Sequence, residues 1–257
     1  MKKLINIYKK GGETPLEAIH RFRSVHTEYE GIPITYAGRL DPMAEGVLIL
    51  LTGDEAKKKD EYLKLDKEYR FEVLFGFSTD TFDVLGKNTS IVNTIVNTSE
   101  VVESDIKKAL TSFIGTHAQA YPPYSSKPVE GKPLFVWARE GKLDEIEIPT
   151  HIIEVYSIEL KQYKKINKTV LEKNIKEKIS LVHGDFRQSE ILESWEKSLL
   201  QSANEELVIA TIMIRASSGT YVRTIANEIG KKLGVPSLTY SIVRTKVGEH
   251  TTEDSLK

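Results

Sequence analysis

The sequence contains no cysteine among its 257 residues. This absence excludes disulfide bonds, thiolate zinc sites and a cysteine nucleophile. The six histidines show neither an HxxxH nor an HExxH spacing, so a metal site would need ligands gathered from scattered positions. We therefore expect no metal, and any catalytic nucleophile must come from another residue type.

Long apolar runs are also missing. No stretch of 18 apolar residues occurs, and the apolar segment after Met1 ends near Tyr8, which is too short for a signal-peptide core. With 40% hydrophobic residues the chain can bury a large core. We expect a globular, cytoplasmic, monomeric protein that does not enter a membrane.

The charge balance shows no general excess of either sign. Lysine and arginine number 36 against 37 acidic residues, which argues against a generic nucleic-acid binder. The basic residues concentrate in positions 1–40 and 210–248, whereas the acidic excess lies between about 100 and 206. If the two ends of the chain meet in the fold they would form a basic face; otherwise they are two ordinary solvated surfaces.

Helical and strand patterns alternate irregularly along the chain. Thr14, Pro15 and Glu17 form a helix start with a capping box, and residues 67–76 alternate strictly, with Tyr69 on the apolar side. The remaining expectations are a strand at 4–8, loop plus weak strand at 88–98, helix at 104–114, strand at 152–162, a poorly patterned stretch to about 178, a helical packing face at 186–200, strand at 206–216, helix to Gly234 and a final strand near 238–250. This order predicts a mixed α+β fold with a largely antiparallel central sheet and flanking helices.

Three residues require explanation together. Asp41 lies in a glycine-containing turn directly before the apolar segment 47–51, where an unpaired carboxylate would be costly to bury. An aspartate followed by proline, such as Asp41, is most often a turn residue or a helix cap. A tyrosine on the apolar side of a strand, such as Tyr69, is most often a plain core residue. Arg223 lies in the first turn of a helix, where its charge opposes the helix dipole, so we expect a compensating anion. The obvious intramolecular anion is Asp41.

The segment "GRLDPMAEGVLIL" resembles the signature turn of the TruB family of tRNA pseudouridine synthases, G-x-L-D-P-x-A-x-G-V-L. Other segments resemble family motifs in the family's order: "INIYKKGGETPLEAIHRFR", "KEYRFEVLFGFSTDTFDVLG", "QAYPPYSSKPVEGKPLFVWAREG", "SSGTYVRTIANEIGKKLG" and "YSIVRTKVGEHTTEDSL". The resemblance covers nearly the whole chain except roughly 163–206.

The resemblance implies the pseudouridine synthase catalytic fold and an activity. The reaction would be isomerisation of uridine to pseudouridine at position 55, in the T-loop of tRNA, without cofactor or metal. The T-arm of tRNA would be the partner. Asp41 would be the family's essential aspartate, which attacks the nucleoside or drives formation of a glycal-like intermediate. A paired guanidinium would favour the charged carboxylate that such a role needs.

The resemblance also assigns substrate contacts. A uridine inside a structured loop must be extruded before it can react, and Tyr69 matches the family tyrosine that stacks on the extruded uracil. Tyr36 stands where the family usually has histidine and is a candidate for base flipping. Further substrate contacts are expected from Gly38, Arg39, Tyr221, Arg223 and Ile242, and contacts with the RNA backbone from Lys9 and Lys10.

The motif order indicates one catalytic domain over 1–257. Residues 163–206 are expected to be an insertion, more a packing appendage than a second active site. The last family motif is followed directly by Lys257, so we expect no C-terminal RNA-binding domain of the PUA type.

Two alternatives stay open. The first is a catalytically silent protein that binds or folds tRNA on the same scaffold. The second is an unrelated aspartate-dependent enzyme that uses "KKGGET" as a phosphate loop, although this loop lacks the G-x-x-x-x-G-K-[ST] order. Carbodiimide-based mapping of the T-loop uridine after incubation would separate these alternatives from pseudouridine synthesis, and the silent protein predicts tRNA binding that survives Asp41→Asn.

Overall fold

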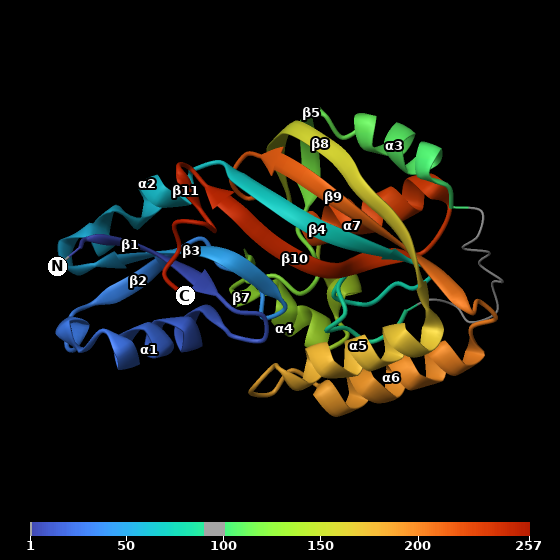
Figure 1. The fold of residues 1–257 in the computed structure, drawn as a ribbon, viewed down its shortest axis with the longest axis horizontal. Helices are drawn as coiled ribbons and strands as arrows, with labels where there is room; N and C mark the ends of the chain where they lie inside the picture. The colour runs from blue at the N-terminus through green and yellow to red at the C-terminus, as the bar shows by residue number, and fades with distance from the viewer. Residues whose placement is uncertain (1, 90–100) are drawn as a thin grey trace.

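A nine-stranded sheet forms the centre of the structure, a computed structural model that describes residues 2–89 and 101–257 (Figure 1). The strand order is β1-β3-β10-β4-β9-β8-β5, with β2 paired to β3 and β11 to β10. Only the β10–β3 pairing is parallel among these strands. The strands are β1 Leu4–Lys9, β2 Ile34–Ala37, β3 Ala44–Thr52, β4 Lys67–Phe75, β5 Gly115–Ala120, β8 Thr150–Asn167, β9 Glu206–Ala216, β10 Ser237–Val247 and β11 His250–Thr251. The prediction of an α+β fold with a largely antiparallel sheet is confirmed.

Helices cover both faces of this sheet (Figure 1). The apolar sides of α3 and α7 pack on one face, and those of α5 and α6 pack on the other. The helices are α1 Pro15–Val25, α2 Lys59–Leu63, α3 Glu103–Thr111, α4 Leu134–Arg139, α5 Lys168–Ser180, α6 Gln188–Gln201 and α7 Val222–Leu233; α4 follows a small hairpin of β6 Pro128–Val129 and β7 Lys132–Pro133. Two of the four apolar clusters among the described residues therefore lie on opposite faces of the sheet.

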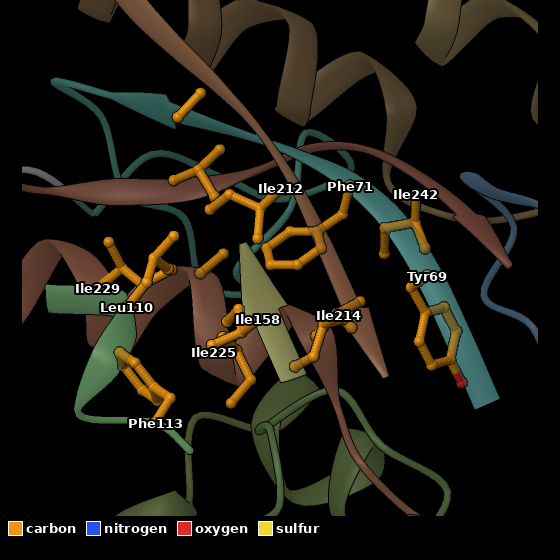
Figure 2. Close-up of a cluster of buried hydrophobic side chains, with 14 of the residues drawn as sticks. Tyr69, Phe71, Leu110, Phe113, Ile158, Ile212, Ile214, Ile225, Ile229 and Ile242 are labelled. Atoms are coloured by element: carbon orange, nitrogen blue, oxygen red, sulfur yellow. The ribbon is translucent and has the colours of Figure 1, made fainter. Parts of the chain in front are cut away.

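Alternation along β4 and β9 decides which core each side chain enters. On β4, Phe71 and Val73 join the core under α7, whereas Leu74 joins the core under α5 and α6. Residues i and i+2 of a strand share a face, so this division follows directly from the sequence pattern. Figure 2 shows the α7 side, where Tyr69 lies at one end of the cluster, close to Ile242.

The start of α1 confirms the predicted capping box. The Thr14 hydroxyl accepts a hydrogen bond from the Glu17 amide at 3.2 Å, and the Glu17 carboxylate accepts one from the Thr14 amide at 2.7 Å. Two amides that the helix itself cannot satisfy are thereby bonded.

The stretch before α6 differs from expectation. The strand predicted to end near residue 162 continues as β8 to Asn167, and the stretch expected to be poorly patterned contains helix α5. Only Leu171, Ile175 and Ile179 of α5 are buried, one residue per turn, and such a narrow apolar stripe leaves a weak periodic signal. The helical packing face expected after residue 186 is confirmed as α6. The tract 88–98, expected to be loop plus weak strand, lies mostly outside the described residues.

The two basic segments considered above, residues 1–40 and 210–248, meet where Arg244 Nη2 donates to the Gly38 carbonyl at 3.0 Å. The C-terminal residues also reach β1. Leu256 donates to the Asn6 carbonyl at 2.9 Å and accepts from the Tyr8 amide at 2.8 Å. The cations Lys9, Arg223 and Arg244 are buried and add nothing to a basic surface. Within residues 2–89 and 101–257, no helix is long and apolar enough to cross a membrane, and no three His, Asp or Glu side chains are grouped to hold a metal ion.

Candidate active site

Asp41 lies in the turn between β2 and β3. The Ala44 amide donates to the Asp41 carbonyl at 3.0 Å, and the Gly12 amide donates to the Pro42 carbonyl at 2.8 Å. Gly38 begins the turn with a φ of 84°, a conformation that residues with a Cβ rarely adopt. The Asp41 side chain is 32% exposed, so its carboxylate is held by the fold and still reaches solvent.

Arg223, in the first turn of α7, forms an ion pair with Asp41. Arg223 Nε lies 2.8 Å from Asp41 Oδ2, and Nη2 donates to Oδ1 at 3.3 Å. The Arg223 side chain is only 3% exposed. The pairing predicted from the position of Arg223 in its helix is confirmed.

The other contacts of the Arg223 guanidinium fix its plane. Nη1 donates to the Thr81 carbonyl at 2.7 Å, and Nη2 also donates to the Tyr124 carbonyl at 3.2 Å. A second carboxylate, that of Asp83, lies 3.8 Å from Nε. Burial disfavours the charge, but the attraction of Asp41 and Asp83 outweighs burial and raises the pKa of Arg223.

Asp83 was not among the residues predicted for the site. It lies in the loop after β4, where Oδ1 accepts hydrogen bonds from the Thr81 hydroxyl at 2.7 Å and the Leu85 amide at 2.9 Å. Burial raises the pKa of Asp83 to about 6; Arg223 acts in the opposite direction, and the like charge of Asp41 adds to the rise. In the sequence, Asp83 is the second aspartate of the segment "TDTFD", and the sequence analysis assigned no role to it.

The raised pKa of Asp83 predicts a specific pH dependence of stability. Folding strengthens proton binding at this carboxyl, so the stabilisation is complete below pH ~4, the usual aspartate value, and is lost as pH rises through about 6. A shift of about two pKa units corresponds to roughly 3 kcal/mol. From pH 4 to 7, the free energy of unfolding of the wild type should therefore fall by up to this amount relative to Asp83→Asn. Urea titrations of both proteins measure the difference, and parallel pH profiles would contradict the shift.

Two tyrosines flank the ion pair. Tyr69 lies on β4 opposite Arg244 of β10, and burial raises its pKa while the charge of Arg244 acts in the opposite direction. Tyr221 precedes α7, where the Gln119 side chain accepts from its amide at 2.8 Å and donates to its carbonyl at 3.2 Å. Burial, assisted by the charge of Asp41, raises the pKa of Tyr221 to about 12. Both rings are therefore neutral phenols at pH 7.

Arg244 is a second buried arginine that sequence reasoning missed. Its Nε donates to the Val47 carbonyl at 2.8 Å and its Nη2 to the Gly38 carbonyl at 3.0 Å. Gly46 allows this close approach of β10 to β3, because a Cβ there would lie 2.2 Å from the Arg244 carbonyl oxygen. Arg244 thus holds the backbone that leads into Asp41. In the sequence it is the arginine that directly follows Ile242 and Val243 in the predicted final strand.

The remaining predicted residues divide between core and rim. Ile242 is 4% exposed and belongs to the same apolar cluster as Tyr69. Arg39 is exposed; its guanidinium donates to the Ser126 hydroxyl at 2.6 Å and to the Tyr36 hydroxyl at 3.2 Å. The Lys59 ammonium lies 5.3 Å from the centre of the Tyr36 ring. Tyr36 and Arg39 therefore form a polar rim beside the Asp41 turn.

The expectation that Lys9 contacts an RNA backbone does not fit the structure. Lys9 is fully buried, and its ammonium donates to the carbonyls of Ala44 at 2.5 Å, Lys10 at 3.0 Å and Pro42 at 3.2 Å. Burial lowers the pKa of Lys9 to about 8. Lys9 supports the turn after Asp41 from inside, whereas Lys10 is exposed and remains a candidate contact.

Residues 28–184 match the model of the TruB family pseudouridylate synthases (N terminal domain). A tRNA pseudouridine synthase B of Caldanaerobacter subterraneus is 31% identical over 98% of this chain and 71% of its own length. The tRNA pseudouridine synthase B of Aquifex aeolicus is 29% identical over 97% of this chain and 70% of its own length.

Solved structures share the fold at lower identity. A chain in the structure of an H/ACA RNP bound to a substrate RNA containing 2′-deoxyuridine aligns with a TM-score of 0.53 at 17% identity, over 95% of this chain. A chain of an archaeal box H/ACA sRNP complex aligns with a TM-score of 0.52. The chain spans about half the length, 47%, of each of these two chains.

Proposed function

The chain belongs to the TruB family of pseudouridylate synthases, and from this membership we propose that it isomerises a uridine of tRNA to pseudouridine. In this reaction the N1–C1′ bond of the nucleoside breaks, a C5–C1′ bond forms, C5 loses its proton and N1 gains one. We place the target uridine in the T-loop, at position 55. The observation that carries the proposal is the Asp41–Arg223 ion pair, with one carboxylate still open to solvent.

Asp41 is the proposed catalytic residue. A nucleophile or base must be ionised, and the buried guanidinium 2.8 Å away stabilises the charged carboxylate. Arg244 donates to the Gly38 carbonyl before Asp41, and Lys9 donates to the Pro42 carbonyl after it. Because the backbone on both sides is fixed, the carboxylate loses little conformational entropy when a substrate binds. It would attack C1′ or drive formation of a glycal-like intermediate.

Base flipping brings the uridine to this carboxylate. A base in a structured loop cannot be reached in place, and an extruded base is stabilised by stacking on an aromatic ring. We assign this stacking to Tyr69, whose raised pKa keeps the phenol neutral, with Tyr221 and Ile242 as further contacts. Tyr36 is proposed to occupy the space that the base leaves.

Contacts with the T-arm are proposed for the polar rim. Arg39 and Lys10 are exposed near the Asp41 turn and can approach phosphates. Residues 1–257 are proposed to act as one catalytic domain into which 163–206 is inserted. The cytoplasmic location and the monomeric state remain predictions.

The proposed activity predicts one modified position in an unmodified tRNA transcript. After incubation with the wild-type protein, carbodiimide labelling followed by primer extension should give a single new stop at the T-loop uridine. A transcript with cytidine at that position should give no stop and serves as the control. If the wild type leaves the T-loop uridine unmodified, the proposed function is wrong.

A further inference from the structure

Helix α6 is fastened to the loop of residues 78–89, which carries two contacts of Arg223. The Trp195 indole donates to the Val84 carbonyl at 3.1 Å, and the Ser194 hydroxyl accepts from the Asn88 amide at 2.9 Å. Lys87 forms an exposed ion pair with Glu190. These contacts join parts of the chain that are more than 100 positions apart, so the 78–89 loop takes its place partly from the segment 163–206.

Arg187, immediately before α6, adds a largely buried ion pair to this interface. Its Nη1 donates to Asp80 Oδ2 at 2.7 Å and its Nη2 to Oδ1 at 3.4 Å, and its side chain is only 16% exposed. The guanidinium also lies over the Tyr124 ring, 4.5 Å from the ring centre. One planar group therefore holds two loops, a combination that a lysine cannot reproduce.

These two loops supply the carbonyl groups that orient Arg223. The Thr81 carbonyl follows Asp80 directly in the chain, and the Tyr124 carbonyl belongs to the residue on which Arg187 stacks. Arg223 in turn holds Asp41. A continuous set of contacts thus runs from Arg187 through both loops to the carboxylate, although Arg187 itself contacts neither Arg223 nor Asp41 in any hydrogen bond or ion pair among the described residues.

We propose that Arg187 is a positioning residue for the reaction, and that the segment 163–206 thereby takes part in organising the active site. This inference rests on the proposed function, because its kinetic test needs pseudouridine formation. Misplacement of a catalytic group by about 1 Å can cost 10²-fold in rate. Loss of Arg187 leaves Asp41 and Arg223 in the chain but loosens the carbonyls that fix the guanidinium plane.

The kinetic test separates the rate of the bound complex from tRNA affinity. Under single-turnover conditions Arg187→Ala should form pseudouridine about 10- to 100-fold more slowly than wild type, with a tRNA Kd within about twofold. Arg187→Lys should remain slow, because it lacks the bidentate fork. Lys87→Ala removes an exposed ion pair of the same interface and is the matched control with an unchanged rate. A wild-type rate in Arg187→Ala, or a loss explained by Kd alone, overturns the proposal.

A second variant protects the test against a simple folding defect. Asp80→Asn breaks the same link from the opposite side without altering the 163–206 segment, and it should slow the reaction in the same way. The double variant should lose less than the sum of the two single losses, because both changes remove the Arg187–Asp80 ion pair and only the contact of Arg187 with the Tyr124 ring is left to lose. Additive losses in the double variant would contradict a shared role. Thermal melting of each variant establishes that it is folded.

Hydrogen exchange tests the positioning without any activity. The amides of Asp80 and Phe82 are bonded to the carbonyls of Lys87 and Thr79, at 3.0 and 3.2 Å. They should exchange faster in Arg187→Ala than in wild type or Lys87→Ala. Unchanged exchange overturns the inference. If instead the wild type forms no pseudouridine, the proposed function fails while the exchange result still decides whether Arg187 fixes the loop.

Discussion

Asp41→Asn should abolish pseudouridine formation while the protein stays folded, and we expect the rate to fall by at least about 10⁴-fold. Asparagine has nearly the same shape as aspartate but cannot carry the negative charge that attack or proton abstraction requires. The side chain at this position is 32% exposed, and Arg223 keeps Asp83 and two carbonyls as partners, so the effect on stability should be small. Single-turnover kinetics with a T-arm transcript measure the rate.

The matched control for this substitution is Asp54→Asn. Asp54 is an exposed aspartate paired with Lys57 on the surface, and its loss should leave the rate unchanged. Binding of tRNA should survive in both variants, because neither aspartate contributes a positive charge that could hold a phosphate. Comparable rates for wild type and Asp41→Asn would remove Asp41 from the chemistry. Binding without modification by the wild type would favour the alternative of a catalytically silent tRNA-binding protein.

Arg223→Ala should lower both rate and stability. Removing one partner of a buried ion pair leaves a charge without compensation, which costs about 3 kcal/mol of the free energy of unfolding. Asp83 is the more affected carboxylate, with a side chain 8% exposed against 32% for Asp41, and the Thr81 and Tyr124 carbonyls lose their donor. The reaction should slow by about 10²- to 10³-fold because the remaining Asp41 is neither oriented nor charge-stabilised.

Two comparisons sharpen this prediction. Lys231→Ala removes a charge from the same helix, but that lysine is exposed and its ion pair with Glu228 is a surface pair, so stability should change by less than about 0.5 kcal/mol. Arg223→Lys keeps the positive charge without the planar fork and should restore little of the rate. Urea unfolding and single-turnover kinetics give both quantities. An Arg223→Ala protein with wild-type stability and rate would show that the ion pair carries neither.

Local patterns predicted the parts of the structure whose causes are local. The capping box of α1 depends on residues 14 to 17, and the two-residue alternation of β4 places Tyr69 and Phe71 in the same core. Arg223 was predicted to need an anion because its charge opposes the dipole of its own helix. Asp41, 182 positions away, was predicted as that anion because a carboxylate at the edge of the core needs a partner of its own.

Long-range compensation could not be predicted in this way. Lys9 and Arg244 appear in the sequence as ordinary cations, but in the structure backbone carbonyls of distant turns satisfy them and they are buried. Asp83 acquires its raised pKa from burial, which depends on how the 78–89 loop is covered. The helix α5 was missed because its buried stripe is one residue wide. For Lys9, Arg244 and Asp83 the cause is a tertiary contact, whereas the local pattern of α5 is present but weak.

The structure of this protein bound to a T-arm stem-loop tests the central claim most directly. We predict that the target uridine is extruded from its loop, with its ring on Tyr69 and its C1′ about 3 to 3.5 Å from the Asp41 carboxylate, while Arg223 still holds that carboxylate. A complex in which the uridine stays stacked within the loop, or in which the extruded base lies away from Asp41, would contradict the account.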